Sequence, residues 1–154
     1  KMKKITLDKK GICEYQQNRD PYLLIDHASE IVPGKKVKGF KNFKESDWFF
    51  KVHWPQDPNV PGMLQIESLV QMSALTILTL NGNKGKKMYL TSADKIKFYK
   101  KILPKSKFDI NSKVLSYKRG VASFEAEGFV DSKIVCKASF TLVLPEEVKK
   151  YSLS

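Results

Sequence analysis

The sequence predicts an α+β fold in which an antiparallel sheet wraps around one long central helix. The segment Met63–Leu80 contains neither proline nor glycine and is apolar on nearly every side, which is typical of a helix buried on most of its surface. Most of the remaining chain consists of short apolar or alternating segments that end in turn-like pairs, which is typical of strands. A sheet folded around the helix is the economical way to keep water from all of its faces.

Two strands are predicted before the helix, and they form a hairpin. Residues 22–32 are rich in branched and aromatic types and end at Pro33-Gly34, a turn-like pair. Val37–Phe43 then alternates weakly between apolar and polar residues. Residues 45–61 are predicted to be a loop. Prolines recur there at every third position, which stiffens the chain toward an extended conformation, namely at Pro55, Pro58 and Pro61.

The central helix is predicted over about residues 62–80, with a length of roughly 27 Å, and ends at Asn81-Gly82-Asn83. Four strands follow it: Met88–Lys97, Phe108–Tyr117, Val121–Val130 and Ile134–Leu144. Arg119-Gly120 and Asp131-Ser132 separate the last three as tight turns. Glu146 onward is interpreted as a polar tail. No repeat or linker is visible, so residues 1–154 are expected to form a single domain.

The composition is that of a globular domain with an excess of positive charge. The chain has 154 residues, of which 42% are hydrophobic and 29% charged, enough to bury a core without disulfide or metal. Lysine and arginine exceed aspartate and glutamate by 28 − 16 = 12. This excess favours an acidic partner, which can be nucleic acid, an anionic membrane or an acidic protein. Two cysteines, Cys13 and Cys136, and two histidines argue against a disulfide framework and against a metal site.

No targeting segment or membrane span is predicted. The basic start, Lys1–Lys10, reaches Asp8 before any apolar run develops. The charge-free stretch Ser68–Asn83 is too short and too polar to cross a bilayer. We therefore expect a soluble, cytoplasmic protein with free thiols.

Glu67 and Gln71 are the polar pair of interest on the helix. They lie four residues apart and therefore share a face. Burial would raise the pKa of the carboxyl group, the direction that a general acid needs near neutral pH. A glutamate at the wet edge of the helix, or a structural hydrogen bond to Gln71, explains the same pattern.

His53 and Gly62 flank the proline-containing loop. An imidazole held among aromatic residues by a stiff loop suits a general base, although for this residue alone a surface loop histidine packed on Trp54 is the simpler interpretation. Gly62 lets a ligand approach the helix start, where free N–H groups can polarise a carbonyl, but any helix start shares that property. His27, within an apparent strand, is interpreted as structural.

Taken together, residues 53–71 (HWPQDPNVPGMLQIESLVQ) resemble the active-site signature of the β-hydroxyacyl-acyl carrier protein dehydratases. That signature has His-Phe-Pro, a later Pro, Pro-Gly, and then a helix with Glu and Gln. The spacings 62 − 53 = 9 and 67 − 53 = 14 agree with it. Residues 19–26 (RDPYLLID) look like the family's Arg-Tyr-Pro-Phe-Leu-Leu-Val-Asp segment, and Lys133–Cys136 looks like its last strand. The resemblance covers about residues 12–144.

The chain also departs from the family pattern. Val52 and Gln56 stand where the family usually has glycine, and Asn18 and Asp20 replace the His and Tyr beside Arg19. The substrate range or the activity is therefore expected to differ from that of typical members.

The resemblance implies a hot-dog fold, a homodimer with shared active sites, and possible assembly into trimers of dimers. It implies dehydration of a (3R)-hydroxyacyl thioester on acyl carrier protein to the trans-2-enoyl thioester, without a cofactor. The Gly62 N–H would hold the thioester carbonyl, His53 would remove the α-proton, and Glu67 of the other subunit, oriented by Gln71, would protonate the leaving hydroxyl.

Two further sets of residues follow from the same resemblance. An acyl tunnel would be lined by Leu64, Tyr89 and Phe98. A docking surface for the acidic acyl carrier protein would comprise Lys95, Lys97, Lys100 and Lys101, which are otherwise simply solvated lysines.

Two other classes of function remain open at this point. A hot-dog hydratase, thioesterase or non-catalytic acyl-thioester binder is favoured by Val52 and Gln56. A basic nucleic-acid-binding module is favoured only by the charge of +12, and most aromatic residues lie in apolar-patterned segments rather than among exposed basic stripes.

Overall fold

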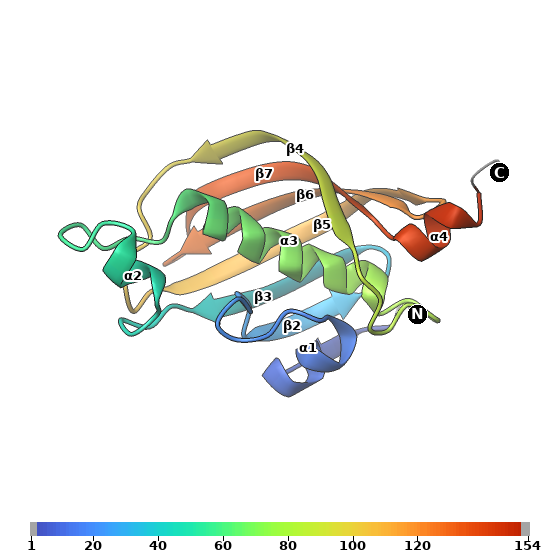
Figure 1. Ribbon diagram of the computed structural model, residues 1–154, viewed down its shortest axis with the longest axis horizontal. Coiled ribbons are helices and arrows are strands. Elements are labelled where there is room, and N and C mark those ends of the chain that lie inside the picture. The colour runs from blue at the N-terminus through green and yellow to red at the C-terminus, as the bar shows by residue number, and fades with distance from the viewer. Residues whose placement is uncertain (1–2, 152–154) are drawn as a thin grey trace.

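Seven strands form one antiparallel sheet in the order β1-β2-β3-β5-β6-β7-β4, as seen in the computed structural model, which describes residues 3–151 (Figure 1). The elements are β1 Ile5–Leu7, α1 Lys9–Tyr15, β2 His27–Val32, β3 Lys36–Asn42, α2 Phe49–Val52, α3 Gly62–Leu78, β4 Tyr89–Phe98, β5 Lys107–Lys118, β6 Val121–Val130, β7 Lys133–Val143 and α4 Pro145–Lys149. The predicted arrangement of one sheet around one long helix is confirmed.

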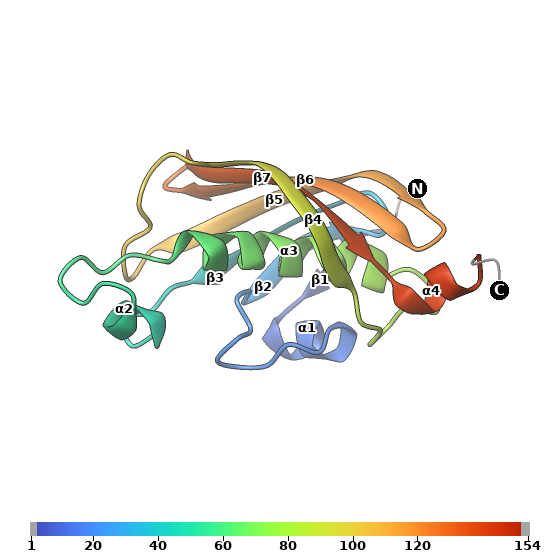
Figure 2. The ribbon, with the colours of Figure 1, turned by 45° about the horizontal axis from the view of Figure 1, so that its top comes forward.

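The helix α3 lies along the concave side of the sheet, with α1 on its other side (Figure 2). Every residue from Gln65 to Leu78 is buried except Glu67. The buried hydroxyl groups of the helix are satisfied: Ser68 Oγ donates to the Leu24 carbonyl, and Ser73 Oγ lies 2.6 Å from Ser112 Oγ. The helix ends two residues earlier than predicted, because the Asn83 side chain donates to the Ile77 carbonyl and replaces another helical turn.

Strands β3 to β7 agree with prediction to within one residue at each end. Both turns of the β5–β6–β7 meander have two central residues with positive φ, namely Arg119-Gly120 and Asp131-Ser132. This backbone shape twists in the same sense as the flanking strands and so favours tight hairpins. In β7 the predicted apolar face is buried from Cys136 through Leu142.

The prediction of a strand over residues 22–32 is wrong in its first half. Only His27–Val32 forms β2. Residues 22–25 run over α3, and the Asp26 N–H makes the first backbone bond to β3, at the Phe40 carbonyl. The Leu24 N–H donates to Gln71 Oε1, and the Leu24 carbonyl accepts from Ser68 Oγ. Both backbone groups of Leu24 are therefore bonded to helix side chains and are not available to a neighbouring strand. The apolar run therefore reflects burial of residues 23–25 against α3.

Short elements were missed at both ends of the chain and in the loop. At the N-terminal end, β1 and α1 were not predicted. Asp8 is nevertheless a typical helix cap, because its side chain accepts a hydrogen bond from the Gly11 N–H. Helix α2 interrupts the predicted loop over residues 45–61, and α4 replaces the start of the predicted polar tail. Elements of three to seven residues are too short to show a periodic pattern.

Strand β4 forms one edge of the sheet and pairs only with β7. All of its residues are exposed except the half-buried Ile96, including the large apolar side chains of Tyr89, Leu90 and Phe98. A long exposed strand edge offers unpaired N–H and C=O groups to another strand. Within residues 3–151, none of the helices has the length and apolar character needed to cross a membrane.

Candidate active site

His53 follows α2 directly and lies half-buried at the start of the proline-containing loop. Its N–H donates to the Phe49 carbonyl at 2.8 Å, and its ring stacks on Trp54 with centroids 4.6 Å apart. Its Nδ1 lies 3.1 Å from the Asn59 carbonyl oxygen. Because a carbonyl oxygen only accepts, Nδ1 carries the proton, and the lone pair of the neutral ring is on Nε2. The contact thus prepares Nε2 to act as a base.

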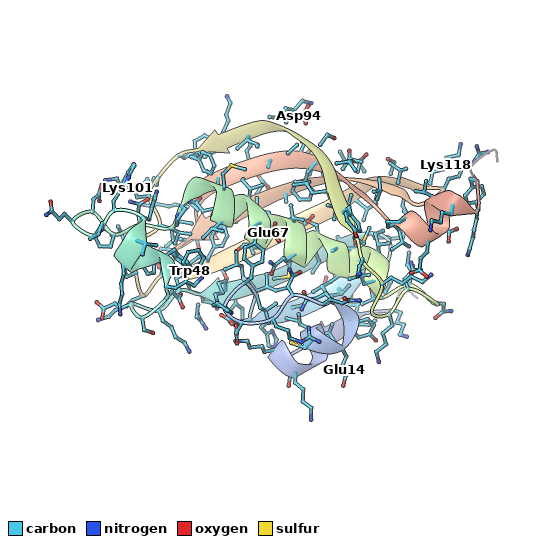
Figure 3. The ribbon with its side chains drawn as sticks, in the orientation of Figure 1. Glu14, Trp48, Glu67, Asp94, Lys101 and Lys118 are labelled. Carbon is cyan, nitrogen blue, oxygen red and sulfur yellow. The ribbon has the colours of Figure 1, made fainter. Side chains whose placement is uncertain are left out.

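The loop after His53 is fixed at its far end. The Val60 N–H donates to the Ile102 carbonyl, and Gln65 Nε2 donates to the Val60 carbonyl at 3.0 Å. Lys101 forms a 2.7 Å ion pair with Asp57 in the same loop. Figure 3 shows Lys101 and Trp48 at the end of the molecule where α2 lies. The imidazole is therefore carried on a braced loop rather than a free one.

The departures at positions 52 and 56 have a structural explanation. Val52 belongs to α2, and neither Val52 nor Gln56 has a positive φ, so the backbone does not require glycine at either position. Both side chains are exposed. Side chains at these two positions extend into solvent.

Glu67 and Gln71 are in contact on α3. Gln71 Nε2 donates to Glu67 Oε2 and to the Tyr22 carbonyl, both at 2.9 Å, while its Oε1 accepts from the Leu24 N–H. These three partners fix the orientation of the amide and present an N–H to the carboxyl group. Burial raises the pKa of Glu67, and the Gln71 hydrogen bond opposes that rise. Tyr22 also has a raised pKa, because of burial and the nearby charge of Glu67.

The raised pKa of Glu67 predicts a pH-dependent effect of Glu67→Gln on stability. A glutamate with a raised pKa in the folded state weakens folding when ionised. This cost is absent below the unfolded pKa and is complete above the folded pKa. Because glutamine does not ionise, the melting temperature of Glu67→Gln minus that of wild type is expected to grow as the pH rises above about 4, until Glu67 is fully ionised in the folded state. Thermal unfolding followed by circular dichroism measures it.

Glu146→Gln is the matched control, because it removes an exposed glutamate from α4 and changes the net charge equally. A melting-temperature difference for Glu67→Gln that stays constant with pH would contradict the prediction.

Gly62 begins α3 at a place where a side chain would not fit. A Cβ built at this position would lie 2.8 Å from Cζ of Phe98, whose ring packs on the glycine. The Pro61 carbonyl accepts from Leu64 and Gln65, and within residues 3–151 the Gly62 N–H has no hydrogen-bond acceptor. This free donor lies at the positive end of the helix dipole, which favours a carbonyl or enolate oxygen.

The structure separates the predicted base from the predicted acid within one chain. His53 and Gly62 belong to the start of α3 and its preceding loop, whereas Glu67 lies one to two turns further on, beside Tyr22. Among the described residues, no hydrogen bond joins His53 to Glu67. No group of three or more side chains in residues 3–151 is arranged to hold a metal ion.

The predicted tunnel residues lie in different parts of the molecule. Phe98 covers Gly62, and the half-buried Leu64 belongs to the same turn of α3. Tyr89, at the other end of β4, lines a separate cavity with Ala74 and Leu78. Of the predicted docking lysines, Lys101 is paired with Asp57, whereas Lys95, Lys97 and Lys100 are exposed without an ion pair among the described residues.

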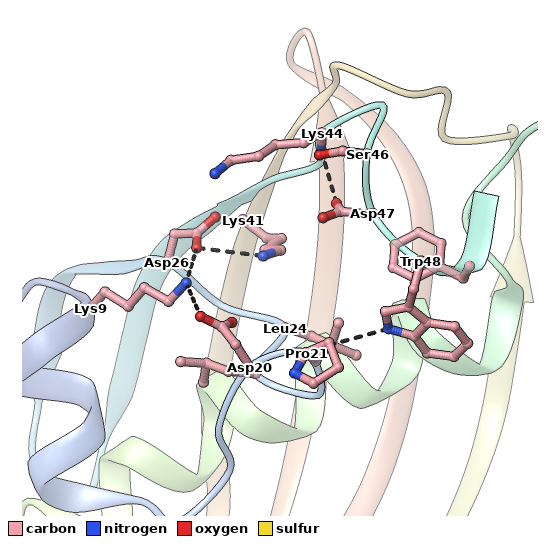
Figure 4. A pocket seen from close by; sticks show the side chains of 12 residues that line it. Lys9, Asp20, Pro21, Leu24, Asp26, Lys41, Lys44, Ser46, Asp47 and Trp48 are labelled. Carbon is pink, nitrogen blue, oxygen red and sulfur yellow. Dashed lines mark hydrogen bonds and ion pairs between the residues drawn. The ribbon is translucent and has the colours of Figure 1, made fainter. Parts of the chain in front are cut away.

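A cavity of about 310 Å³ beside α2 was not predicted from the sequence (Figure 4). Lys9 bridges Asp20 and Asp26, and the buried Lys41 lies 3.5 Å from Asp26, so the charges in its wall compensate one another. The Trp48 indole N–H donates to the Pro21 carbonyl. These residues lie far apart in the sequence and show no common motif, so no local signal could have revealed the cavity.

The chain is similar to known proteins over most of its length. Residues 17–139 match the family described as FabA-like domain. The chain is 34% identical to the 3-hydroxyacyl-[acyl-carrier-protein] dehydratase FabZ of Clostridium novyi, over 81% of this chain and 94% of that protein. It is 31% identical to the enzyme of the same name from Bacillus subtilis, over 91% of this chain and 99% of that protein.

Solved structures show the same fold. The dehydratase heterocomplex ApeI:P from Xenorhabdus doucetiae superimposes with a TM-score of 0.73 at 15% identity, covering 90% of this chain and 95% of that chain. A hypothetical thioesterase with coenzyme A from Streptococcus pneumoniae gives a TM-score of 0.60 at 16% identity, covering 76% and 83%. The predicted hot-dog fold is thereby confirmed.

Proposed function

The chain belongs to the FabA-like family, and from this premise we propose that it is a hydro-lyase acting on (3R)-3-hydroxyacyl thioesters of acyl carrier protein. The product is the trans-2-enoyl thioester, formed in fatty acid or related lipid biosynthesis in the cytoplasm. The observation that carries the proposal is the presence of an imidazole whose Nδ1 is bonded to the Asn59 carbonyl, leaving Nε2 free, together with a glutamate whose pKa is raised. They lie at the spacing that the dehydratase signature requires.

Each group has one step in the proposed reaction. His53 Nε2 takes the α-proton, and the negative charge that develops on the thioester oxygen is stabilised by the Gly62 N–H. Protonated Glu67, oriented by Gln71, gives its proton to the 3-hydroxyl group, which leaves as water while the C2–C3 double bond forms. The imidazolium and the carboxylate then regain their starting states by proton exchange with solvent. No cofactor takes part in this sequence.

We propose that the acid and the base come from two subunits of a homodimer. The separation of His53 from Glu67 within one chain supports this, as does the open edge of β4. Two copies of β4 paired about a two-fold axis would extend the sheet and bury Tyr89, Leu90 and Phe98. Further assembly into trimers of dimers is part of the proposal.

The acyl chain is proposed to pass between Phe98 and Leu64 toward the dimer interface, with Tyr89 lining its far end. Acyl carrier protein is proposed to dock on Lys95, Lys97, Lys100 and Lys101. Three of these lysines are exposed without ion pairs among the described residues, and Lys101 braces the loop of His53, so docking would occur beside the catalytic base.

The direct test is to incubate the protein with (3R)-3-hydroxyacyl-acyl carrier proteins of several chain lengths. The expected result is growth of the enoyl-thioester absorbance without release of free thiol. Thiol release would instead establish a thioesterase, and binding without either signal would establish a non-catalytic acyl-thioester binder. Either of these two outcomes would overturn the proposal.

A further inference from the structure

Gln65 carries a polar group that the proposed mechanism does not use. Its side chain lies in the first turns of α3 and is 4% exposed. Its Nε2 donates to the Val60 carbonyl at 3.0 Å, while its Oε1 is buried without a partner. Within the described part of the chain, this is the one buried side-chain oxygen or nitrogen without a hydrogen bond.

The unpaired oxygen shows what the side chain contributes. Turning the amide over would place Oε1 against the Val60 carbonyl, two acceptors facing each other, so the observed orientation is the favourable one. A buried acceptor without a donor weakens folding, and a methionine or leucine would fill the same space without that cost. The bond to Val60 is thus the interaction for which an amide at this position is needed.

The Val60 carbonyl lies one peptide away from the partner of His53. The Asn59 carbonyl, which faces His53 Nδ1, and the Val60 N–H, which donates to Ile102, belong to the same peptide group. Gln65 holds the next peptide group along the chain. Two consecutive peptide planes are therefore anchored, one by the backbone of Ile102 between β4 and β5 and one by the Gln65 side chain of α3. The orientation of the Asn59 carbonyl depends on both.

We propose that Gln65 is a positioning residue for His53, acting through the Val60 and Asn59 peptide groups to hold the imidazole in the tautomer with its proton on Nδ1. The proposal deepens the dehydratase function and rests on it. Without this bond the Asn59 carbonyl turns away from Nδ1, both tautomers become populated, and only a fraction of the molecules presents a lone pair on Nε2.

The test is Gln65→Met, which removes the donor and keeps the length of the side chain. The control is Thr76→Val, which removes another buried hydrogen bond of α3, from Thr76 Oγ1 to the Ser73 carbonyl, far from the loop. For Gln65→Met, kcat is expected to fall between about ten- and a hundred-fold, with KM within about two-fold of wild type. Thr76→Val is expected to retain the wild-type kcat, with a melting temperature similar to that of Gln65→Met.

A second measurement separates positioning from a general loss of structure. The chain has only two histidines, so nitrogen NMR of the imidazole rings can follow His53 after assignment with His27→Gln. Wild type is expected to show the Nδ1-protonated tautomer of His53, and Gln65→Met a mixture of tautomers with His27 unchanged. Gln65→Asn, whose amide is one methylene too short to reach Val60, is expected to behave in the same way.

An unchanged His53 tautomer in both Gln65 variants, or a kcat equal to that of Thr76→Val, would overturn the proposal. Failure of the dehydratase function is a distinct result, because wild type would then form no enoyl product, whereas the tautomer of His53 can be measured in either case. The loop carboxylate Asp57 pairs with Lys101, and neither residue is changed in any variant.

Discussion

Replacement of His53 by alanine is expected to lower kcat for dehydration by at least about two orders of magnitude. The variant loses the group that accepts the α-proton, and neither of the groups that contact His53 can replace it. Trp54 has no basic nitrogen, and the backbone carbonyl of Asn59 is not a base. The measurement is the initial rate of enoyl-thioester formation at saturating substrate.

His27→Ala is the control for this prediction. His27 is also half-buried and also stacks on an aromatic ring, that of Phe40, but it belongs to β2 and lies outside the proposed site. It is expected to retain nearly all of the activity. A rate for His53→Ala close to that of wild type, in protein of unchanged oligomeric state, would show that the imidazole is not the base.

Glu67→Gln is expected to reduce kcat about as strongly, and the two inactive variants are expected to restore activity when combined. Glutamine can still bond to Gln71 but has no proton to give to the leaving hydroxyl group. In mixed dimers of His53→Ala and Glu67→Gln chains, one of the two shared sites holds both wild-type groups. An equal mixture should therefore reach about a quarter of the wild-type rate.

The complementation experiment requires that the subunits exchange. The two variants are mixed, dissociated and reassembled, and mixed dimers are verified by differently tagged chains before the assay. Each variant reassembled alone serves as the control. Verified mixed dimers without recovered activity would show that His53 and Glu67 do not meet across a subunit interface.

The features that could be predicted from the sequence are those with a strong local signal. The helix α3 is apolar on nearly all sides, and the β5–β6–β7 hairpins have the turns predicted at Arg119-Gly120 and Asp131-Ser132. His53, Gly62 and Glu67 could be selected together because their spacing forms one continuous motif. Their individual patterns were each compatible with an ordinary structural role.

The features that could not be predicted depend on contacts between distant residues. Residues 22–25 have the composition of a strand, and only the contacts with Ser68 and Gln71 show that the backbone of Leu24 bonds to the helix instead. The burial of Lys41 beside Asp26 could not be predicted either, because nothing in the sequence distinguishes Lys41 from the many other lysines. The role of Gln65 also needed coordinates, because its partner Val60 is defined by geometry and not by residue type.

The bond between His53 and the main chain at Asn59 has a consequence for how freely this loop can change. Since the acceptor is a peptide carbonyl, every amino acid at position 59 supplies the same oxygen, and exchange of the Asn59 side chain leaves that acceptor in place. The acceptor that faces His53 Nδ1 is therefore the same kind of atom whichever residue stands at position 59. Val52 and Gln56 are both exposed, so their side chains likewise leave the contact between His53 and Asn59 in place.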